Sequence, residues 1–545
     1  MNIFQTFHDQ VNMSGWVSVA NFKEIFSGIS ATEFANHSRY PFLLGESVSN
    51  IKVVKAKGAS SFKVNNSMAS PGRTPLNYLF PLSGSSAEGE LDSFTLGSSS
   101  QCQFILPDYT ISPKHATIYR KGGTCFLKDL GSEFGSFVNS VSFGSKDVAL
   151  ADGDSISIGR YQFIFLEPRT LFEYIFTYSG ESNASVILEE DITEERISEN
   201  NKLRKDLKSE LHQSSTYAAT CISSGDFTGF DERVLKILSF VPFFNSFSTA
   251  EIKQIISFHN RFLSSKKNDF IIRENDKSDA FYIVLKGRVN VVRSSHATPL
   301  NSLGPSSTFG EIAFLLGSPR YASVVAQEDT ILFGIDRDMF QNIGIEIRVK
   351  IKLQIIRQMS AIIHRQNIYL QEQRRQESGS IPRIFGNADD SHVELDTSES
   401  IRQSAKRLEK IPLFSGFSKF EMNSLVIAID KIGKYTDGAI ILREGRLNNV
   451  FYFILEGSVY VTGAESSTIL STLKQGKFFG EMSVFSKSLV SANIISRGDA
   501  TIMMIPTDNF HAMPVETREK LLDLVLKQTI DRQSDQNMHM LKYSE

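Results

Sequence analysis

Short apolar runs separated by polar turn residues fill much of the C-terminal half of the chain. Between Phe281 and Val292, two runs of β-branched and aromatic residues flank Lys286 and Gly287, which predicts two short strands joined by a turn. A short helix is predicted before them at 249–258 and a long helix after them at 345–376, because apolar residues recur there at helical spacing. This order predicts a small β-barrel with flanking helices. The long helix carries its apolar positions at Ile351, Ile355, Met359 and Ile362.

The same pattern occurs a second time, 170 residues further along the chain. Three separate matches share this offset, which is hard to obtain by chance and indicates a duplicated domain. In the second copy, short helices are predicted at 419–429 and 517–532. The matches are VPFFNSF from Val241 with IPLFSGF from Ile411, FYIVLKGRV from Phe281 with FYFILEGSV from Phe451, and FGEIAF from Phe309 with FGEMSV from Phe479.

A second all-β pattern lies before the repeats, between Leu76 and Pro168, where short apolar runs alternate with Gly, Ser and Asp turns. The polar stretch 377–400 reads as a linker, and the charged stretch 187–208 as a solvated helix or linker. The predicted fold is mainly β with flanking helices. We predict an unassigned region at 1–70, a β-sandwich at 71–170, a helical linker at 171–233, a first barrel domain at 234–376, a linker at 377–403, a second barrel domain at 404–532 and a tail at 533–545.

Composition narrows the classes of partner. The chain has 545 residues, enough for several domains, and a net charge of −3, which gives no general attraction to nucleic acid or membranes. It shows no apolar run of membrane-spanning length and no secretory signal, so we expect a cytoplasmic protein that binds neither nucleic acid nor membrane. The cysteines lack the spacing of metal ligands; we expect reduced, buried thiols, no metal and no cofactor. They are Cys102, Cys125 and Cys221.

The segment from Phe309 to Arg320 carries the candidate chemistry of the first copy. Gly310 lets a ligand approach the backbone, and a short helix from Glu311 would present amides to an anion. Arg320 could reach back to a phosphate as a bidentate donor. Glu311 suits a sugar hydroxyl, which donates to a carboxylate. Together these groups indicate a ribose cyclic phosphate as ligand.

This segment resembles the phosphate-binding cassette of cyclic-nucleotide-binding domains, as in bacterial catabolite activators and cyclic-AMP-dependent kinase regulatory subunits. The resemblance implies that Glu311 binds the ribose 2′-hydroxyl and Arg320 the cyclic phosphate, with cyclic AMP ahead of cyclic GMP as ligand. Two positions depart from the family: Tyr321, which follows the arginine, and Asn275, where a glycine is usual. The site residues implied by the resemblance are Gly310, Glu311, Ile312, Ala313, Arg320, Tyr321 and Ala322.

The second copy departs from the family at the residue that matters most for a phosphate. Val490 stands where Arg320 stands in the first copy, so the main charge opposing a phosphate is lost. Lys487 is close in sequence and could act as a point charge. We predict a structural or weakly binding domain. A weak site would consist of Gly480, Glu481, Met482, Ser483, Ser491 and Ala492.

The all-β region at 71–170 resembles a forkhead-associated (FHA) domain, a β-sandwich that binds phosphothreonine peptides. The resemblance rests on Gly97, Ser112 with His115, the DLGS run from Asp129, and the GSFVN run from Gly135. Ser98 replaces the family's phosphate-contacting arginine, and Phe134 its asparagine. A generic anion or protein surface is therefore weighed equally with phosphothreonine binding, and His115 is expected to brace a loop. The candidate contacts are Ser98, Ser112, Lys114, Ser136 and Asn139.

Two hypotheses follow. In the first, the chain is a non-enzymatic signalling adaptor: a cyclic nucleotide in the first barrel shifts its closing helix, and the FHA domain binds a protein partner. In the second, it is a ligand-free interaction scaffold, which Ser98 and Val490 favour and Glu311 with Arg320 oppose. A catabolite-activator-like DNA-binding protein is set aside because no helix-turn-helix follows the second barrel. Kinases, cyclases and phosphodiesterases are set aside because no segment is long enough for their catalytic domains.

Overall fold

The fold is that of a computed structural model, in which the chain divides into two compact units, Met1–Ile343 and Gly344–Glu545. None of the helices in the described part of the chain is both long and apolar enough to cross a membrane. The structure describes residues 3–4, 6–7, 16–38, 40–49, 73–82, 93–99, 101–106, 108, 110–143, 147–178, 194–238, 241–277, 279–294, 299–377, 393–395, 408, 411–446, 448–463, 469–486 and 490–544.

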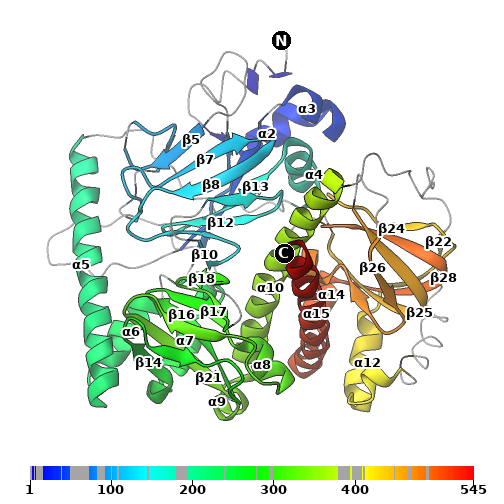
Figure 1. Cartoon of the computed structure of the whole chain (residues 1–545). Coiled ribbons are helices and arrows are strands. Elements are labelled where there is room, and N and C mark those ends of the chain that lie inside the picture. Colours follow the sequence, from blue (N-terminus) through cyan, green and yellow to red (C-terminus); the bar gives the residue numbers. More distant parts are fainter. Residues whose placement is uncertain are drawn as a thin grey trace. The chain divides into compact units, whose positions relative to one another are not determined.

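A β-sandwich forms the N-terminal part of the first unit (Figure 1). One sheet has the order β1-β4-β2-β13-β12-β9-β10, with β3 paired to β2, and the other has the order β11-β8-β7-β5-β6. Phe80, Phe104 and Phe163 pack together in the core between the sheets. The strands are β1 (Val17–Ser18), β2 (Phe42–Ser49), β3 (Arg73–Pro75), β4 (Tyr78–Pro81), β5 (Ser93–Gly97), β6 (Phe104–Ile105), β7 (Ala116–Lys121), β8 (Thr124–Asp129), β9 (Ser136–Val138), β10 (Val141–Ser142), β11 (Val148–Leu150), β12 (Ser155–Ile158) and β13 (Tyr161–Leu166).

The larger sheet buries side chains on both faces. Successive side chains of a strand point to opposite faces, so Leu43 enters the sandwich core while Phe42 and Leu44 enter a second, phenylalanine-rich core. Three helices cover that outer face: α2 (Val19–Phe26), α3 (Ala31–His37) and α4 (Pro168–Tyr178). The region 1–70, for which the sequence predicts no fold, thus supplies strands and helices to the sandwich.

Two helices follow the sandwich in the first unit, α5 (Glu194–Ser224) and α6 (Phe230–Leu238), and α5 contacts α6 and β14. The first barrel then forms from two sheets with the orders β14-β21-β16-β19 and β15-β20-β17-β18. Its elements are η1 (Pro242–Phe244), α7 (Thr249–Ile256), η2 (His259–Arg261), β14 (Phe262–Ser265), β15 (Phe270–Ile272), β16 (Ala280–Lys286), β17 (Val289–Val292), β18 (Asn301–Leu303), β19 (Thr308–Phe309), α8 (Glu311–Leu316), β20 (Ser323–Ala326), β21 (Thr330–Asp336) and α9 (Arg337–Asn342).

The two strands and the turn predicted around Lys286–Gly287 are present, but the strands do not pair with each other. Strand β16 pairs with β19 and β21, whereas β17 pairs with β18 and β20, so the chain passes from one sheet to the other at this point. Gly287 has φ of 84°, and a Cβ there would lie 2.5 Å from the carbonyl oxygen of Asp329. The glycine is therefore needed for a corner of the barrel.

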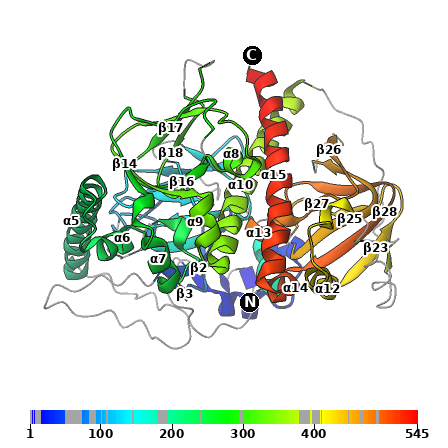
Figure 2. The ribbon, with the colours of Figure 1, turned by 90° about the horizontal axis from the view of Figure 1, so that it is seen from below.

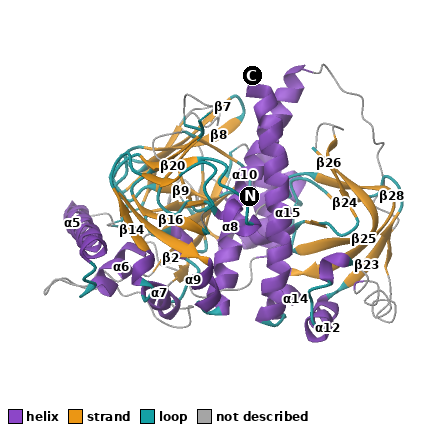
Figure 3. Cartoon of the chain, turned by 60° about the horizontal axis from the view of Figure 1, so that its bottom comes forward, coloured by secondary structure: helices purple, strands orange, loops and turns teal. Residues whose placement is uncertain are grey.

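The second unit contains the long helix α10 (Ile345–Glu377), the second barrel and the C-terminal helix α15 (Val515–Ser544), and α10 packs beside α15 (Figures 2 and 3). The barrel sheet has the order β22-β23-β28-β25-β26, and β24 and β27 also pair with it. Strand β22 comes from the stretch interpreted as a linker. The elements are β22 (Val393–Leu395), η3 (Pro412–Phe414), α12 (Lys419–Ala428), β23 (Lys431–Tyr435), β24 (Ile440–Leu442), β25 (Val450–Thr462), β26 (Ile469–Lys474), β27 (Phe478–Phe479), α13 (Glu481–Ser486), β28 (Asn493–Pro506) and α14 (Thr507–Ala512).

The 170-residue offset of the sequence is retained in the elements of the two barrels. Helices α8, α9 and α10 begin at residues 311, 337 and 345, and α13, α14 and α15 begin at 481, 507 and 515. Local signals repeat too, because Ser248 with Glu251 and Ser418 with Glu421 form equivalent capping boxes. The predicted fold class, a sandwich followed by two barrels with flanking helices, is confirmed.

Candidate functional site

The first cassette begins where strand β19 ends and the short helix α8 starts. Gly310 is the N-cap of α8, with φ of 85°, a conformation that residues with a Cβ rarely adopt. A Cβ at this position would lie 2.7 Å from the Arg320 Nη1. Glycine therefore lets the arginine lie directly against the cassette backbone.

Glu311 carries a buried oxygen that is ready to accept a hydrogen bond. Its Oε2 is buried and has no hydrogen-bond partner among the residues that the structure describes. Burial raises the pKa of Glu311, and the nearby Arg320 opposes that rise. A buried, unsatisfied acceptor is costly, and a ligand hydroxyl would satisfy it.

Arg320 is buried, with 2 % of its surface exposed, and its guanidinium faces the cassette backbone. Its Nη1 donates to the carbonyl oxygen of Gly310 at 2.6 Å, and its Nη2 donates to the carbonyl oxygen of Ala280. Burial lowers the pKa of Arg320, and the charge of Glu311 works against this decrease. The cassette thus holds an arginine and a carboxylate near one another in a buried setting, as a cyclic phosphate attached to a ribose requires.

Tyr321 lies outside this buried group, with 54 % of its surface exposed. Its hydroxyl accepts a hydrogen bond of 2.9 Å from Arg293, whose guanidinium also lies 4.3 Å from the tyrosine ring centre. Arg293 in turn contacts Glu274 at 3.5 Å. The residue that departs from the family is therefore part of an exposed polar cluster, not of the buried cassette.

The other predicted residues of the first site lie on α8 or beside Arg320. Ala313 is buried, and Ile312 and Ala322 are half-buried. Asn275, the second departure, has φ of 69°, and its N–H donates to the Arg320 carbonyl at 2.8 Å. Asparagine tolerates this left-handed conformation better than other residues with a side chain, so the usual turn persists without glycine.

The second cassette has the same backbone arrangement without the arginine. Gly445, 170 residues after Asn275, donates its N–H to the carbonyl of Val490 at 2.8 Å, as Asn275 does to Arg320. The Val490 side chain, however, is buried in the apolar core of the barrel. Lys487, the alternative cation, lies outside the described residues.

Asn448 takes over the backbone contacts that Arg320 makes in the first cassette. Its Nδ2 donates to the carbonyl oxygens of Val450 at 2.8 Å and Gly480 at 3.3 Å. These two carbonyls are the 170-residue counterparts of Ala280 and Gly310. Asn448 also contacts the hydroxyl of Ser483 at 3.0 Å. A neutral amide therefore satisfies the groups that a guanidinium satisfies in the first barrel.

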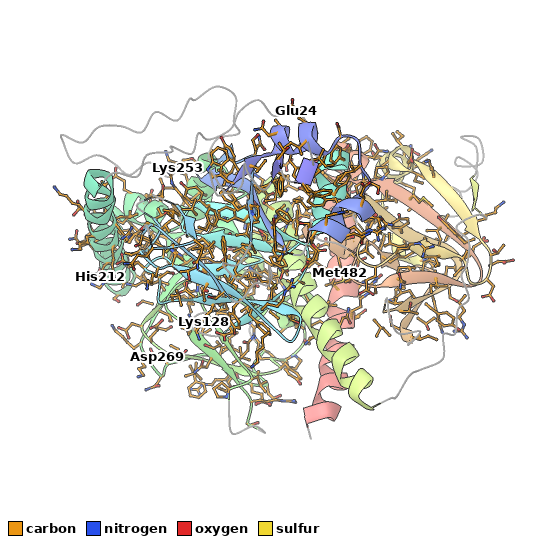
Figure 4. The ribbon with its side chains drawn as sticks, turned by 90° about the horizontal axis from the view of Figure 1, so that it is seen from above. Glu24, Lys128, His212, Lys253, Asp269 and Met482 are labelled. Atoms are coloured by element: carbon orange, nitrogen blue, oxygen red, sulfur yellow. The ribbon has the colours of Figure 1, made fainter. Side chains whose placement is uncertain are left out.

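Glu481 is held by a residue of the same chain. It is 1 % exposed, and its Oε1 accepts a hydrogen bond from Nη1 of Arg532 on α15. Burial raises the pKa of Glu481, and Arg532 opposes that rise. Met482, labelled in Figure 4, also contacts the Arg532 guanidinium. Arg532 thus pairs with one oxygen of the carboxylate that a ribose would need, while Oε2 of Glu481 has no hydrogen-bond partner among the described residues.

A second group of contacts fixes α15 to the same cassette. Gln528 exchanges two hydrogen bonds with the backbone of Phe478, and Arg532 donates to the Phe478 carbonyl at 2.6 Å. Of the remaining predicted residues, Gly480 begins this segment in the left-handed region, Ser491 is half-buried and Ala492 is buried. The predicted weak site is therefore assembled, and Oε1 of Glu481 and the hydroxyl of Ser483 bond to the protein itself, whereas Oε2 of Glu481 is buried without a hydrogen-bond partner among the described residues.

The candidate contacts of the sandwich lie in its loops, and several already have internal partners. Ser112 accepts the N–H of Glu133 at 3.0 Å, and Ser136 donates to Asp129 at 2.6 Å. Asn139 donates to Asp154 and accepts from the N–H of Ser155. Lys114 is exposed.

Two further loop residues behave differently from each other. His115 is buried between the N–H of Ser112 and the carbonyl of Gly135, and burial lowers its pKa to about 4, as suits a brace for the loops. Ser98 accepts a hydrogen bond of 2.9 Å from Arg204 on helix α5.

Sequence reasoning missed Asn448, Arg532 and Arg204, because none lies within the motif that it completes. Of the three, only Asn448 could have been found from the sequence, because it lies within the second repeat, two residues before Val450, the counterpart of Ala280. The three cysteines are buried free thiols. No group of His, Cys, Asp or Glu suited to hold a metal occurs in the part of the chain that the structure describes.

Comparison with known families agrees with this arrangement. The model of the family described as "Cyclic nucleotide-binding domain" matches residues 262–344 and 432–515, and that of the "FHA domain" matches residues 94–159. The chain therefore contains an FHA domain followed by two cyclic nucleotide-binding domains, and the predicted order of domains is confirmed. Both families consist of binding domains.

Curated relatives share the tandem nucleotide-binding part. The cAMP-dependent protein kinase regulatory subunit of Yarrowia lipolytica is 25% identical over 254 residues, which are 46% of this chain and 54% of that protein. The human cGMP-dependent protein kinase 2 is 24% identical over 261 residues, 47% of this chain and 27% of the kinase. The chain spans about half the length of the first of these relatives.

Among solved structures, the regulatory domain of Toxoplasma gondii PKA in co-crystal with cAMP matches at 20% identity, with a TM-score of 0.22. The match covers 55% of this chain and 97% of that chain.

Proposed function

We propose that this chain is a regulatory protein, without catalytic activity of its own, whose first barrel binds a cyclic nucleotide, with cyclic AMP ahead of cyclic GMP. The observation that carries the proposal is the pair formed by Arg320 and Glu311. The arginine is buried at a glycine that leaves it room, and the Oε2 of the glutamate awaits a donor. The names of the relatives, which include cAMP-dependent regulatory subunits, favour the same ligand class.

In this proposal each group has a distinct role. The Glu311 carboxylate accepts a ribose hydroxyl, which removes the cost of its unsatisfied oxygen. Arg320 gives up backbone carbonyls and forms charge-assisted hydrogen bonds to the phosphate, which are stronger than bonds to neutral acceptors. Gly310 permits the close approach, while Ile312 and Ala313 on α8 supply apolar and backbone contacts. Tyr321 and Arg293 contribute an exposed aromatic and cationic surface beside the cassette.

The proposal leaves the second barrel without a nucleotide. Val490 offers no charge, Asn448 already satisfies the backbone carbonyls, and Arg532 already pairs with Glu481. A phosphate placed there would be buried without a cation, which is costly. In this proposal the second barrel instead provides the surface on which helices α10 and α15 pack.

Helix α10 is the element proposed to carry the signal. It follows α9 of the first barrel directly in the chain, and it packs against α13 and α15 of the second unit. Arg348 pairs with Glu519 at 2.6 Å, Lys352 pairs with Asp523 at 2.7 Å, and Arg357 donates to the carbonyl of Phe485 beside the second cassette. A displacement of α10 would therefore change contacts around the second barrel.

The test is a competition assay with a fluorescent cyclic nucleotide on the full chain. We expect Arg320→Met to weaken binding about 100-fold or more, because two charge-assisted hydrogen bonds are lost. Glu311→Gln should weaken it less, and Arg273→Met, which removes an exposed arginine that stacks on Phe270, should leave it unchanged. Arg320→Lys keeps the charge and controls for folding. Wild-type affinity in the Arg320→Met variant would reject the proposed site.

The coupling needs its own test. A protease site inserted between residues 378 and 392 would allow α10 to be separated from the strands of the second barrel. We expect nucleotide affinity to differ before and after cleavage, because α10 is then held to the second barrel only by its contacts with α13 and α15. Equal affinity would reject coupling through the chain connection and leave the binding proposal intact.

The alternative is a ligand-free scaffold, and the occupied second cassette and Ser98 are the observations that favour it. It predicts that neither cyclic AMP nor cyclic GMP shifts the melting temperature of the chain. The FHA domain serves protein interaction under both proposals, and a phosphothreonine-containing partner is the family's usual ligand.

A further inference from the structure

One side of helix α5 is buried along most of its described length. Most of the buried residues are separated by three, four or seven positions, as on one face of a helix, whereas His212, labelled in Figure 4, is on the exposed side. Helix α5 also contacts α6 and β14, and Arg233 of α6 lies 5.4 Å from the ring centre of Tyr217 in the C-terminal half of α5. The buried stripe consists of Arg204, Leu207, Ser214, Ser215, Ala218 and Cys221.

The N-terminal part of the stripe lies against the loops of the FHA domain that contain Ser98, Ser112 and Glu133, here called the recognition loops. The Nη2 of Arg204 donates to the hydroxyl of Ser98 at 2.9 Å, and both residues are buried, with 4 % and 6 % of their surface exposed. One helical turn later, Lys208 lies 3.8 Å from the carboxylate of Glu133. An arginine from a helix outside the domain therefore lies against Ser98, the residue that replaces the family's arginine.

The loops favour a cation from α5 over a phosphate from elsewhere. Burial lowers the pKa of Arg204, and the carboxylates of Glu133 and Asp108 work against that decrease. Asp108 is paired with Arg160 at 2.6 Å, so the carboxylate of Glu133, which lies 3.8 Å from Lys208, is the acidic group of these loops that faces the basic residues of α5. The hydroxyls of Ser112 and Ser136 already bond to groups of the domain itself. Of the candidate phosphate contacts in these loops, Lys114 is exposed and carries a positive charge.

We propose that the recognition loops of this FHA domain bind Arg204 and Lys208 of its own helix α5 and do not bind a phosphothreonine peptide. Because the same helix also contacts α6 and β14, it joins the FHA domain to the first barrel within the first unit. This inference rests on the FHA assignment and is independent of nucleotide binding.

Hydrogen exchange on the full chain, read by mass spectrometry, tests the proposal. In the double variant Arg204→Glu, Lys208→Glu, we expect peptides covering 97–99, 112–115 and 131–135 to exchange about tenfold faster or more, because the contacts that cover them are lost. Lys205→Glu, on the exposed side of the same helix, is the matched control and should exchange as wild type. Glu133→Lys combined with Lys208→Glu should return part of the protection, because the ion pair is re-formed with reversed charges.

A degenerate phosphothreonine peptide mixture, with its unphosphorylated counterpart, provides the second readout. We expect the wild-type chain to show no preference for the phosphorylated mixture. Unchanged exchange in the double variant would overturn the proposal. So would phosphopeptide binding by wild type that Arg204→Ala abolishes, since Arg204 would then be a phosphate ligand. Cyclic-nucleotide affinity should be unchanged in these variants, which would show that their effect on the FHA domain is independent of nucleotide binding in the first barrel.

Discussion

The contact between Arg532 and Glu481 offers a quantitative test of how the second barrel is closed. In Arg532→Met the aliphatic part of the side chain remains, but the carboxylate of Glu481, 1 % exposed, loses its cation. Breaking a buried ion pair by removing one partner costs about 3–5 kcal/mol. The side chain of Arg532 is 22% exposed, so solvent screens part of the pair, and we expect a loss of about 3 kcal/mol at pH 8.

The loss should depend on pH, and its sign follows from the burial of Glu481. Burial already raises the pKa of this carboxyl in the folded chain, and removing Arg532 takes away the group that opposes the rise. The folded variant therefore binds a proton more tightly than the unfolded chain does. Its stability increases as pH falls through the raised pKa toward the ordinary value of a glutamate. The destabilisation should be clearly smaller at pH 5 than at pH 8.

The assay is urea unfolding of the full chain, in which hydrogen exchange of peptides from β27, α13 and α15 reports the unfolding of the second barrel. Arg497→Met, which removes an exposed arginine 5.3 Å from the Tyr460 ring, is the control and should cost less than about 1 kcal/mol. The double variant Glu481→Gln, Arg532→Met should recover much of the loss, because no unpaired charge stays buried. A loss below about 1 kcal/mol at pH 8, or an equal loss at both pH values, would refute this reasoning.

Three further predictions concern single residues of the first unit. Gly310→Ala should weaken cyclic-nucleotide binding at least about tenfold in the competition assay, since its Cβ would lie 2.7 Å from Arg320; unchanged affinity would contradict the cassette geometry. Asn275→Val should lower stability by about 1–2 kcal/mol in urea unfolding, because φ is 69° there, whereas Asn275→Gly should not. Burial raises the pKa of Asp152 to about 7, so this carboxyl should withdraw stability as pH rises from about 4 to 7, opposite in sign to the gain expected from the lowered pKa of His115; the difference between thermal melts of wild type and Asp152→Asn isolates the share of Asp152.

The parts of the site that share one segment could be predicted from the sequence. The run from Gly310 to Arg320 holds the glycine, the carboxylate and the arginine within a dozen residues, and the backbone freedom of the first with the side chains of the other two is enough to predict a ribose phosphate as ligand. The repeat at 170 residues fixed the architecture, because the elements of both barrels follow it. Val490 correctly marked the second cassette as changed.

The contacts that close the second cassette could not be predicted, because they come from distant segments. Arg532 lies 51 residues after Glu481 on a helix whose sequence shows only apolar periodicity, and its partner depends on how that helix packs. Asn448 was within reach, but its role is visible only when the carbonyls of Val450 and Gly480 are seen together. Arg204, in a stretch interpreted as solvated, is buried for the same reason: tertiary packing, not local pattern, places it at Ser98.

The sequence predicted the turn at Gly287 but not how the two strands beside it pair. A glycine between two apolar runs fits a hairpin turn, but it fits equally a strand that bends from one sheet into another. The pairing of β16 with β21 and of β17 with β20 decides between them, and both partners are remote in sequence.

The central claim is that this chain has one cyclic-nucleotide site, in the first barrel. Calorimetric titration of cyclic AMP and cyclic GMP into the full chain, with Arg320→Met and Val490→Ala beside it, tests this claim most directly. We predict a single site per chain with micromolar affinity or better, tighter for cyclic AMP, lost in Arg320→Met and unchanged in Val490→Ala. Two sites per chain, or binding that survives in Arg320→Met, would contradict the account.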